Sequence, residues 1–162
     1  MTDTPPTNPA TAEPHHKRPM PTTIVRASWA GTAAFAVTAI AAVAVTEARI
    51  PAVATAATLF TAGIGIFFWA YAIAVARSRT DSIGIGGLFF LAGKDTPPPG
   101  GTAHKRQLLA SLATQTATAL ATAGARPFTT LAFGVLVPLY GLALTGLYGA
   151  RHGRFGPRPT RK

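Results

Sequence analysis

The chain of 162 residues contains no cysteine and few acidic residues. Without cysteine it can form no disulfide and no thiolate metal site. Only five Asp and Glu stand against 15 Lys and Arg, which gives a formal net charge of +10. Beyond the first 23 residues the acids are Glu47, Asp81 and Asp95, and isolated carboxylates do not form an acid–base pair. The sequence therefore predicts no enzyme, no cofactor and no metal site.

Charged residues are also missing from four long stretches. The stretches are 27–45, 52–76, 108–124 and 128–148, with 19, 25, 17 and 21 residues. A hydrocarbon core about 30 Å thick needs about 20 apolar residues of helix. We therefore expect an all-α membrane protein with four transmembrane helices, of which the third is the weakest. Spans without Asp, Glu, His, Lys or Arg argue against proton-coupled transport, voltage sensing and intramembrane hydrolysis.

The basic residues lie in alternate segments of the chain. The N-terminal segment, the loop between the second and third spans, and the C-terminal tail hold 13 of the 15 Lys and Arg, whereas the other two loops hold only Arg49 and Arg126. Because cytoplasmic loops retain Lys and Arg, we expect a multi-pass plasma-membrane protein with both termini in the cytoplasm. Cations placed at helix ends and in tails, rather than on one folded face, argue against nucleic-acid binding.

A cleaved signal peptide is the alternative explanation of the first span, and it would leave the N-terminus outside. Against it, the N-region is about 25 residues long and the apolar stretch exceeds the usual 7–15 residues.

The expected organisation is two tight helical hairpins joined by one cytoplasmic loop. Pro51 and Pro127 follow the two short outer turns and suit the first turn of a helix. Arg49-Ile50-Pro51 and Arg126-Pro127 are faintly alike. A duplicated two-helix unit would explain the likeness, and so would chance similarity in an Ala/Thr-rich sequence. The expected parts are a disordered Pro-rich tail over 1–23, a membrane domain over 24–150 with spans over 24–46, 52–76, 107–124 and 128–149, a loop over 77–106, and a basic tail over 151–162.

The cytoplasmic loop contains an apolar, Gly-rich segment over 82–93 that is too short to cross a membrane. It is not a phosphate loop, since Leu88 stands where that motif needs its first Gly and Asp95 follows Lys94 where it needs Ser or Thr. An interfacial segment is favoured, and a re-entrant loop and a docking segment for a partner protein stay open. Arg77, Arg79 and Lys94 bracket the segment and are candidate contacts for anionic lipid headgroups.

Polar and small residues recur at helical spacing in the third and fourth spans. Their positions place each set on one helix face, and such a face turns away from lipid because unsatisfied polar groups are costly there. We predict that these residues pack helices together or, alternatively, line a polar cavity. Pro138 also predicts a kink. The residues are Ser111, Gln115, Thr118, Thr122, Gly134, Pro138, Gly141 and Thr145.

The composition is rich in Ala, Thr, Gly and Pro, with Arg in preference to Lys. Together with the stretch over 77–91 and with Arg126-Pro127-Phe128, it carries a resemblance that is partly compositional. Over about residues 24–156 the chain resembles uncharacterised four-helix integral membrane proteins of high-GC actinobacteria. The resemblance implies a membrane location and lends no activity.

The function expected from the sequence is that of a non-enzymatic structural or accessory subunit of a membrane assembly. The alternative is a small oligomeric channel or facilitator for a neutral or lipid-like solute. The expected partners are the lipid bilayer, anionic headgroups, and either further copies of the chain or another membrane protein.

Overall fold

The computed structural model describes residues 21–79, 88–89, 101–125 and 129–153, and within them the chain is helical with no strand. The all-α fold class is confirmed for this part of the chain. In chain order the elements are α1 (Pro21–Ala44), the 3-10 turn η1 (Thr46–Ala48), α2 (Arg49–Arg77), α4 (Gly101–Ala125), the 3-10 segment η2 (Thr130–Leu136) and α5 (Pro138–His152).

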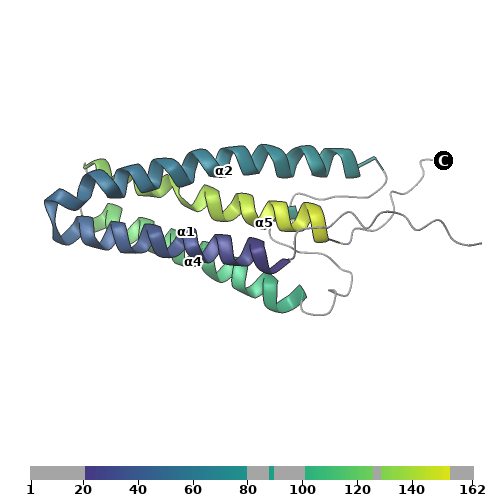
Figure 1. Cartoon of the computed structure of the whole chain (residues 1–162), viewed down its shortest axis with the longest axis horizontal. Coiled ribbons are helices and arrows are strands. Elements are labelled where there is room, and N and C mark those ends of the chain that lie inside the picture. The colour runs from purple at the N-terminus through teal and green to yellow at the C-terminus, as the bar shows by residue number, and fades with distance from the viewer. Residues whose placement is uncertain (1–20, 80–87, 90–100, 126–128, 154–162) are drawn as a thin grey trace, which may run out of the picture.

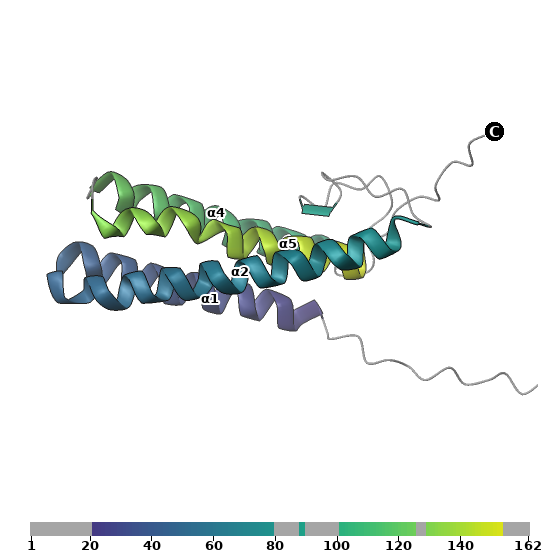
Figure 2. The same cartoon turned by 90° about the horizontal axis from the view of Figure 1, so that it is seen from above.

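The helices form a long four-helix bundle in which two hairpins lie against each other (Figure 1, Figure 2). One hairpin is α1 with α2, and the other is α4 with η2 and α5. Between the hairpins, α2 packs mainly against α5, and α1 packs mainly against α4. Both of these pairs run parallel, so α1 and α4 begin at the same end of the bundle, where α2 and α5 finish (Figure 1).

Three segments of the described chain are long and apolar enough to cross a membrane: Thr22–Ala44, Thr46–Arg77 and Ala132–His152. Helix α4 is not among them, because Ser, Thr and Gln interrupt its apolar residues. The expectation of a helical bundle is thus confirmed for the described residues, and three of its helices have the length and apolarity that a membrane crossing needs. A crossing by α4, like the side on which each end lies, stays a prediction.

Helices α1, α2 and α4 begin before the expected spans, although α1 ends at Ala44, short of residue 46. Helix α1 begins at Pro21 and α4 at Gly101, whereas the spans were expected to start at residues 24 and 107. Helix α2 already begins at Arg49, and it accommodates Pro51 in its first turn, where the backbone N–H has no helical acceptor. The difference arises because polarity limits the part of a helix that can lie in lipid, whereas hydrogen bonding continues beyond it.

The fourth expected span, 128–149, is two elements rather than one kinked helix. Thr130–Leu136 is a 3-10 segment, and the α-helix starts at Pro138. The Val137 amide donates to the Gly134 carbonyl at 3.1 Å, a 3-10 bond. Pro138 has no N–H to donate and its ring clashes with an i−4 carbonyl in a continuous α-helix. The proline therefore separates the two helix types.

Helix α5 is the most enclosed helix of the bundle. From Ala143 to Ala150 every residue is buried. Its closest neighbour is α2: a Cβ added to Gly63 would lie 2.9 Å from both the backbone N and the Cα of Tyr140. Glycine at position 63 thus lets the two backbones come into contact, as small residues do in membrane helix pairs.

Several expectations concern residues outside the described part. The residues concerned are most of the tail over 1–23, most of the loop over 77–106 (Lys94 included), the residue Pro127, and the tail from residue 154 onward.

Candidate functional site

The polar residues predicted on one face of α4 lie along its contact with α1. Ser111 and Gln115 are fully buried, Thr122 is 6% exposed and Thr118 is half-buried. The 4-3-4 spacing of these residues forms one stripe at 100° per residue, and the bundle encloses this stripe. We call Ser111 and Gln115, with their partners on α1, the polar seam.

The partners on α1 are Ser28 and Thr32, which are also buried. The Ser28 and Ser111 hydroxyl oxygens are 2.5 Å apart, and the Gln115 amide nitrogen donates to Thr32 Oγ1 at 2.7 Å. Each pair is separated by 83 positions in the chain. The equal separation means that α1 and α4 run parallel in constant register, so that an i, i+4 pair on one helix meets an i, i+4 pair on the other.

The hydrogen bonds fix the orientation of the Gln115 amide. Thr32 Oγ1 donates its only proton to the Ser28 carbonyl at 2.8 Å, so toward Gln115 it can only accept. The amide therefore presents Nε2 to Thr32 and turns Oε1 away. That oxygen is buried without a hydrogen-bond partner, and it faces Gly141, where an added Cβ would be only 2.7 Å away.

The candidate residues of the fourth span lie beside this seam without extending it. Gly134 faces the Phe35 ring at 3.2 Å from its would-be Cβ, and the buried Thr145 donates to its own helix at the Leu142 carbonyl, 2.7 Å away. Thr122 likewise bonds within α4, to the Thr118 carbonyl at 2.9 Å. Of the four predicted positions on the fourth span, only Gly141 contacts the polar seam.

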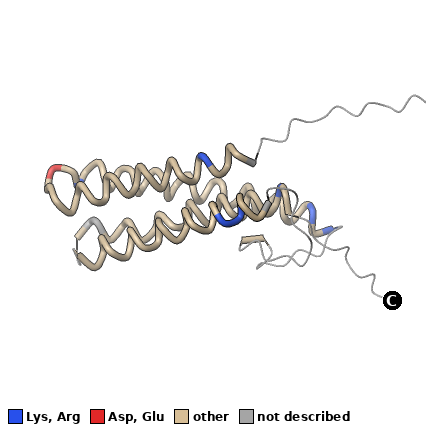
Figure 3. Tube along the Cα trace, turned by 90° about the horizontal axis from the view of Figure 1, so that it is seen from below, with Lys and Arg blue, Asp and Glu red and all other residues tan. Residues whose placement is uncertain are grey.

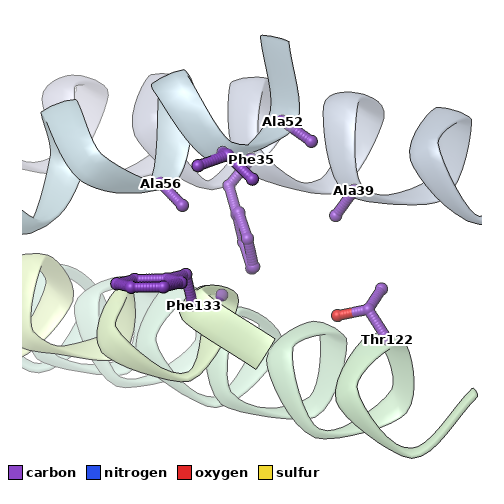
Figure 4. A pocket seen from close by; sticks show the side chains of 8 residues that line it. Phe35, Ala39, Ala52, Ala56, Thr122 and Phe133 are labelled. Carbon is purple, nitrogen blue, oxygen red and sulfur yellow. The ribbon is translucent and has the colours of Figure 1, made fainter. Parts of the chain in front are cut away.

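A small hollow lies between the two hairpins (Figure 4). Its volume is about 10 Å³, roughly the space of one water molecule. The lining is apolar apart from the Thr122 hydroxyl, which already donates within α4. The hollow is too small for an organic solute. It is lined by Phe35, Ala39, Ala52, Val53, Ala56, Thr122, Phe133 and Gly134.

Most of the described Lys and Arg lie toward the end of the bundle where α1 begins and α5 finishes, while Glu47 lies at the other end (Figure 3). Arg77, a candidate lipid contact, makes structural bonds there. Its guanidinium donates to the Ala150 carbonyl at 2.6 Å and to the Gly153 carbonyl at 3.1 Å. These carbonyls belong to the C-terminal end of α5, where a cation is favourable. Arg79, the second candidate, is exposed.

Two residues of the 82–93 segment are described, and both contact the bundle. Leu88 is 4% exposed and packs with Ala74 and Ala150. The Phe89 ring stacks on Phe67 with centroids 5.4 Å apart, and it covers Gly146, whose added Cβ would meet the ring at 2.6 Å. Part of this apolar segment therefore rests on protein at the basic end.

Three buried contacts were not expected from the sequence. The i, i+4 spacing of Ser28 and Thr32 matches that of Ser111 and Gln115 and could have indicated that these two pairs meet. Tyr140 donates to the Ala27 carbonyl at 3.0 Å, and no such spacing indicated this contact. Among the described residues no three His, Asp or Glu side chains are grouped as metal ligands would be.

The fold and this site define a class: a four-helix bundle, three of whose helices can cross a membrane, with a buried polar seam between two parallel helices. Comparison with protein-family models, curated proteins and solved structures finds no match to the chain.

Proposed function

We propose that this chain is a non-enzymatic structural or accessory subunit of a plasma-membrane assembly, with both termini in the cytoplasm. The observation that carries the proposal is the outward face of α4. Six of its residues recur with a spacing of three and four, are small or polar, and are exposed in the single chain. They are Gln107, Ala110, Thr114, Ala117, Ala121 and Gly124, which we call the outer α4 face.

The outer α4 face is poorly suited to lipid and well suited to another helix. Helix α4 falls short of the apolarity that the other three helices reach. The six residues offer little side-chain bulk, although Leu120 on the same side of α4 is 61% exposed. At Gly124 an added Cβ would meet nothing within 4 Å. Close approach between helix backbones is driven in membranes by packing of such small residues, and a spacing of three and four keeps one seam facing a partner.

The inward polar groups support a subunit more than a channel. The Ser111 hydroxyl and the Gln115 amide nitrogen have partners on α1, while Thr122 and Thr145 bond within their own helices. A polar path needs groups left available to a solute, and in the described residues of this seam only Gln115 Oε1 lacks a partner. A channel formed between several copies remains the alternative function.

Cross-linking through a single introduced thiol tests the proposal. Because the chain has no cysteine, Ala117→Cys on the outer α4 face provides the only reactive site. Ala62→Cys is the matched control, since Ala62 is also exposed and lies near the middle of α2, away from both helix ends. In native membranes, oxidation or a bifunctional maleimide should convert Ala117→Cys, and not Ala62→Cys, into one discrete larger species.

The mass of that species distinguishes a second copy of the chain from another protein. Equal cross-linking at both positions would reflect random collision, and no cross-linking at position 117 would leave the outer α4 face in lipid. Either result would remove the support for an assembly through α4.

A further inference from the structure

Arg151, near the end of α5, is held against the exposed indole of Trp69 on α2. The guanidinium carbon lies 4.6 Å from the centroid of the Trp69 ring, which is a cation–π distance. Trp69 is 54% exposed on the outside of the bundle, whereas Arg151 is half-buried between α5 and α2. The contact therefore fixes a planar cation at the surface of the α2–α5 pair.

The hydrogen-bond donors of this pair have no acceptor within the described part of the chain. The Arg151 and Trp69 side chains make no hydrogen bond or ion pair there, and the cation–π contact joins them to each other. A guanidinium carries five N–H donors and an indole carries one. Arg77 differs, because its guanidinium is engaged by the carbonyls of Ala150 and Gly153.

The cation also lies deeper along the bundle than its backbone. The contact between Gly63 and Tyr140 sets a register of 77 positions between the parallel helices α2 and α5, which places the Arg151 backbone level with Ala74. Trp69 is five residues before Ala74, about 7.5 Å at 1.5 Å per residue. The Arg151 side chain thus points back along α5, away from the helix end, as helical side chains lean.

Near a bilayer, a guanidinium whose donors find no acceptor in the protein is favourable beside a counter-charge. In a bilayer, an arginine near a helix end normally extends toward water, whereas the Arg151 side chain leans back along α5 onto Trp69. Aromatic rings such as Trp69 prefer the headgroup level. The chemical group found at that level, with a negative charge and several acceptor oxygens, is the phosphodiester of a phospholipid.

We propose that Arg151 and Trp69 form a binding site for the phosphate of an anionic phospholipid. The guanidinium fork donates to two phosphate oxygens, a geometry that arginine provides and lysine does not, and the indole N–H supplies a further donor. The remaining cations at this end of the bundle (Figure 3) favour a lipid with net negative charge over a zwitterionic one. The site rests on the proposed membrane location but not on the assembly through α4.

Fluorescence of Trp69 tests this site directly in the full-length protein. The chain has two tryptophans, so Trp29→Phe leaves Trp69 as the only reporter. Phosphatidylglycerol is titrated into the protein in a non-ionic detergent, with phosphatidylcholine and inorganic phosphate titrated separately. We expect a saturable change in Trp69 emission with phosphatidylglycerol alone.

Variants in the Trp29→Phe background assign the effect to Arg151. Arg151→Gln should weaken phosphatidylglycerol binding about tenfold, the loss of one charge-assisted pair, and Arg151→Lys about threefold because the fork is lost. Arg106→Gln is the matched control: Arg106 is exposed near the start of α4 at the same end, and its loss should change binding less than twofold. If Arg151→Gln does not fold, phosphatidylglycerol binding by Arg151→Lys is compared with that of Arg106→Gln in the same way.

Three results would overturn the site. Equal weakening by Arg106→Gln and the Arg151 variants would mean diffuse attraction to the basic end. Unchanged binding in the Arg151 variants would remove the guanidinium from the site. An equal response to inorganic phosphate or to phosphatidylcholine would mean that an anionic lipid is not the ligand. Because none of these readouts depends on cross-linking at position 117, failure here and failure of the proposed assembly are separable.

Discussion

Glycine 63 and glycine 65 provide a test of the bundle within one helix. They are two residues apart in α2, and the same change, Gly to Ala, meets opposite surroundings. At position 63 the new Cβ would lie 2.9 Å from the Tyr140 backbone nitrogen, whereas at position 65 it would meet nothing within 4 Å. Any general effect of alanine on the helix is shared by both variants, so their difference reports the contact between α2 and α5.

The expected magnitude follows from the geometry at position 63. An ordinary van der Waals contact begins at 3.4 Å, so α2 and α5 must separate by about half an ångström, and backbone atoms cannot rotate away as a side-chain end does. Overpacking of this kind costs about 1–3 kcal/mol, and alanine returns about 0.5–1 kcal/mol as a better helix former. Gly63→Ala should therefore lower the free energy of unfolding by about 1–2 kcal/mol, while Gly65→Ala should raise it by about 0.5 kcal/mol.

Reversible unfolding by sodium dodecyl sulfate in mixed micelles, followed by circular dichroism, measures both variants against the unaltered chain. A difference of about 2 kcal/mol between them is large compared with the additivity error of independent sites. Equal stability of the two variants would refute the reasoning, because it would mean that α2 does not approach α5 at Tyr140.

Three further predictions use the same measurement. Gln115→Leu should change stability by less than about 1 kcal/mol, because it removes the unpartnered Oε1 together with the bond to Thr32, whereas Gln115→Ala leaves a cavity and should cost about 2 kcal/mol; the reverse order would contradict the close packing of this side chain. Arg77→Gln should cost about 1–3 kcal/mol by removing the bonds to the end of α5, with the exposed Arg79→Gln as a control that should stay within about 0.5 kcal/mol. Gly146→Ala should cost less in a Phe89→Ala background than in the unaltered chain, since the added Cβ meets the Phe89 ring, and additive effects would place that ring elsewhere.

The burial of the α4 stripe could be anticipated from the sequence because spacing alone determines a helix face. Ser111, Gln115, Thr118 and Thr122 fall on one side of any regular α-helix, and polar groups cannot face lipid without cost. Their partners could not be identified in the same way. Many Ser and Thr in this chain occur at helical spacing, and only the parallel arrangement of α1 and α4 selects Ser28 and Thr32.

The limits of prediction were similar at the fourth span and at the basic end. Periodicity places Pro138 within a helical stretch but does not show whether the backbone kinks or changes helix type, which depends on the turn before it. Charge counting treats Arg77 and Arg79 as equivalent, yet Arg77 caps α5 and Arg79 is exposed. The distinction arises from the register between α2 and α5, which is set by the close approach at Gly63 and not by any charge.

Helix α4 is the element on which both the fold and the proposed function depend. Its inward face carries buried hydroxyl and amide groups whose partners lie on α1. Apart from Leu120, its outward face lacks the apolar bulk that would hold it in lipid. Taken alone, such a helix has little reason to enter a membrane. When α4 packs against α1, the Ser111 hydroxyl and the Gln115 amide nitrogen find hydrogen-bond partners. A partner that covered the outer α4 face would shield it from lipid. On the proposed function, a helix of such low apolarity is stable in a membrane when both of its faces are occupied, and the single chain occupies only one of them.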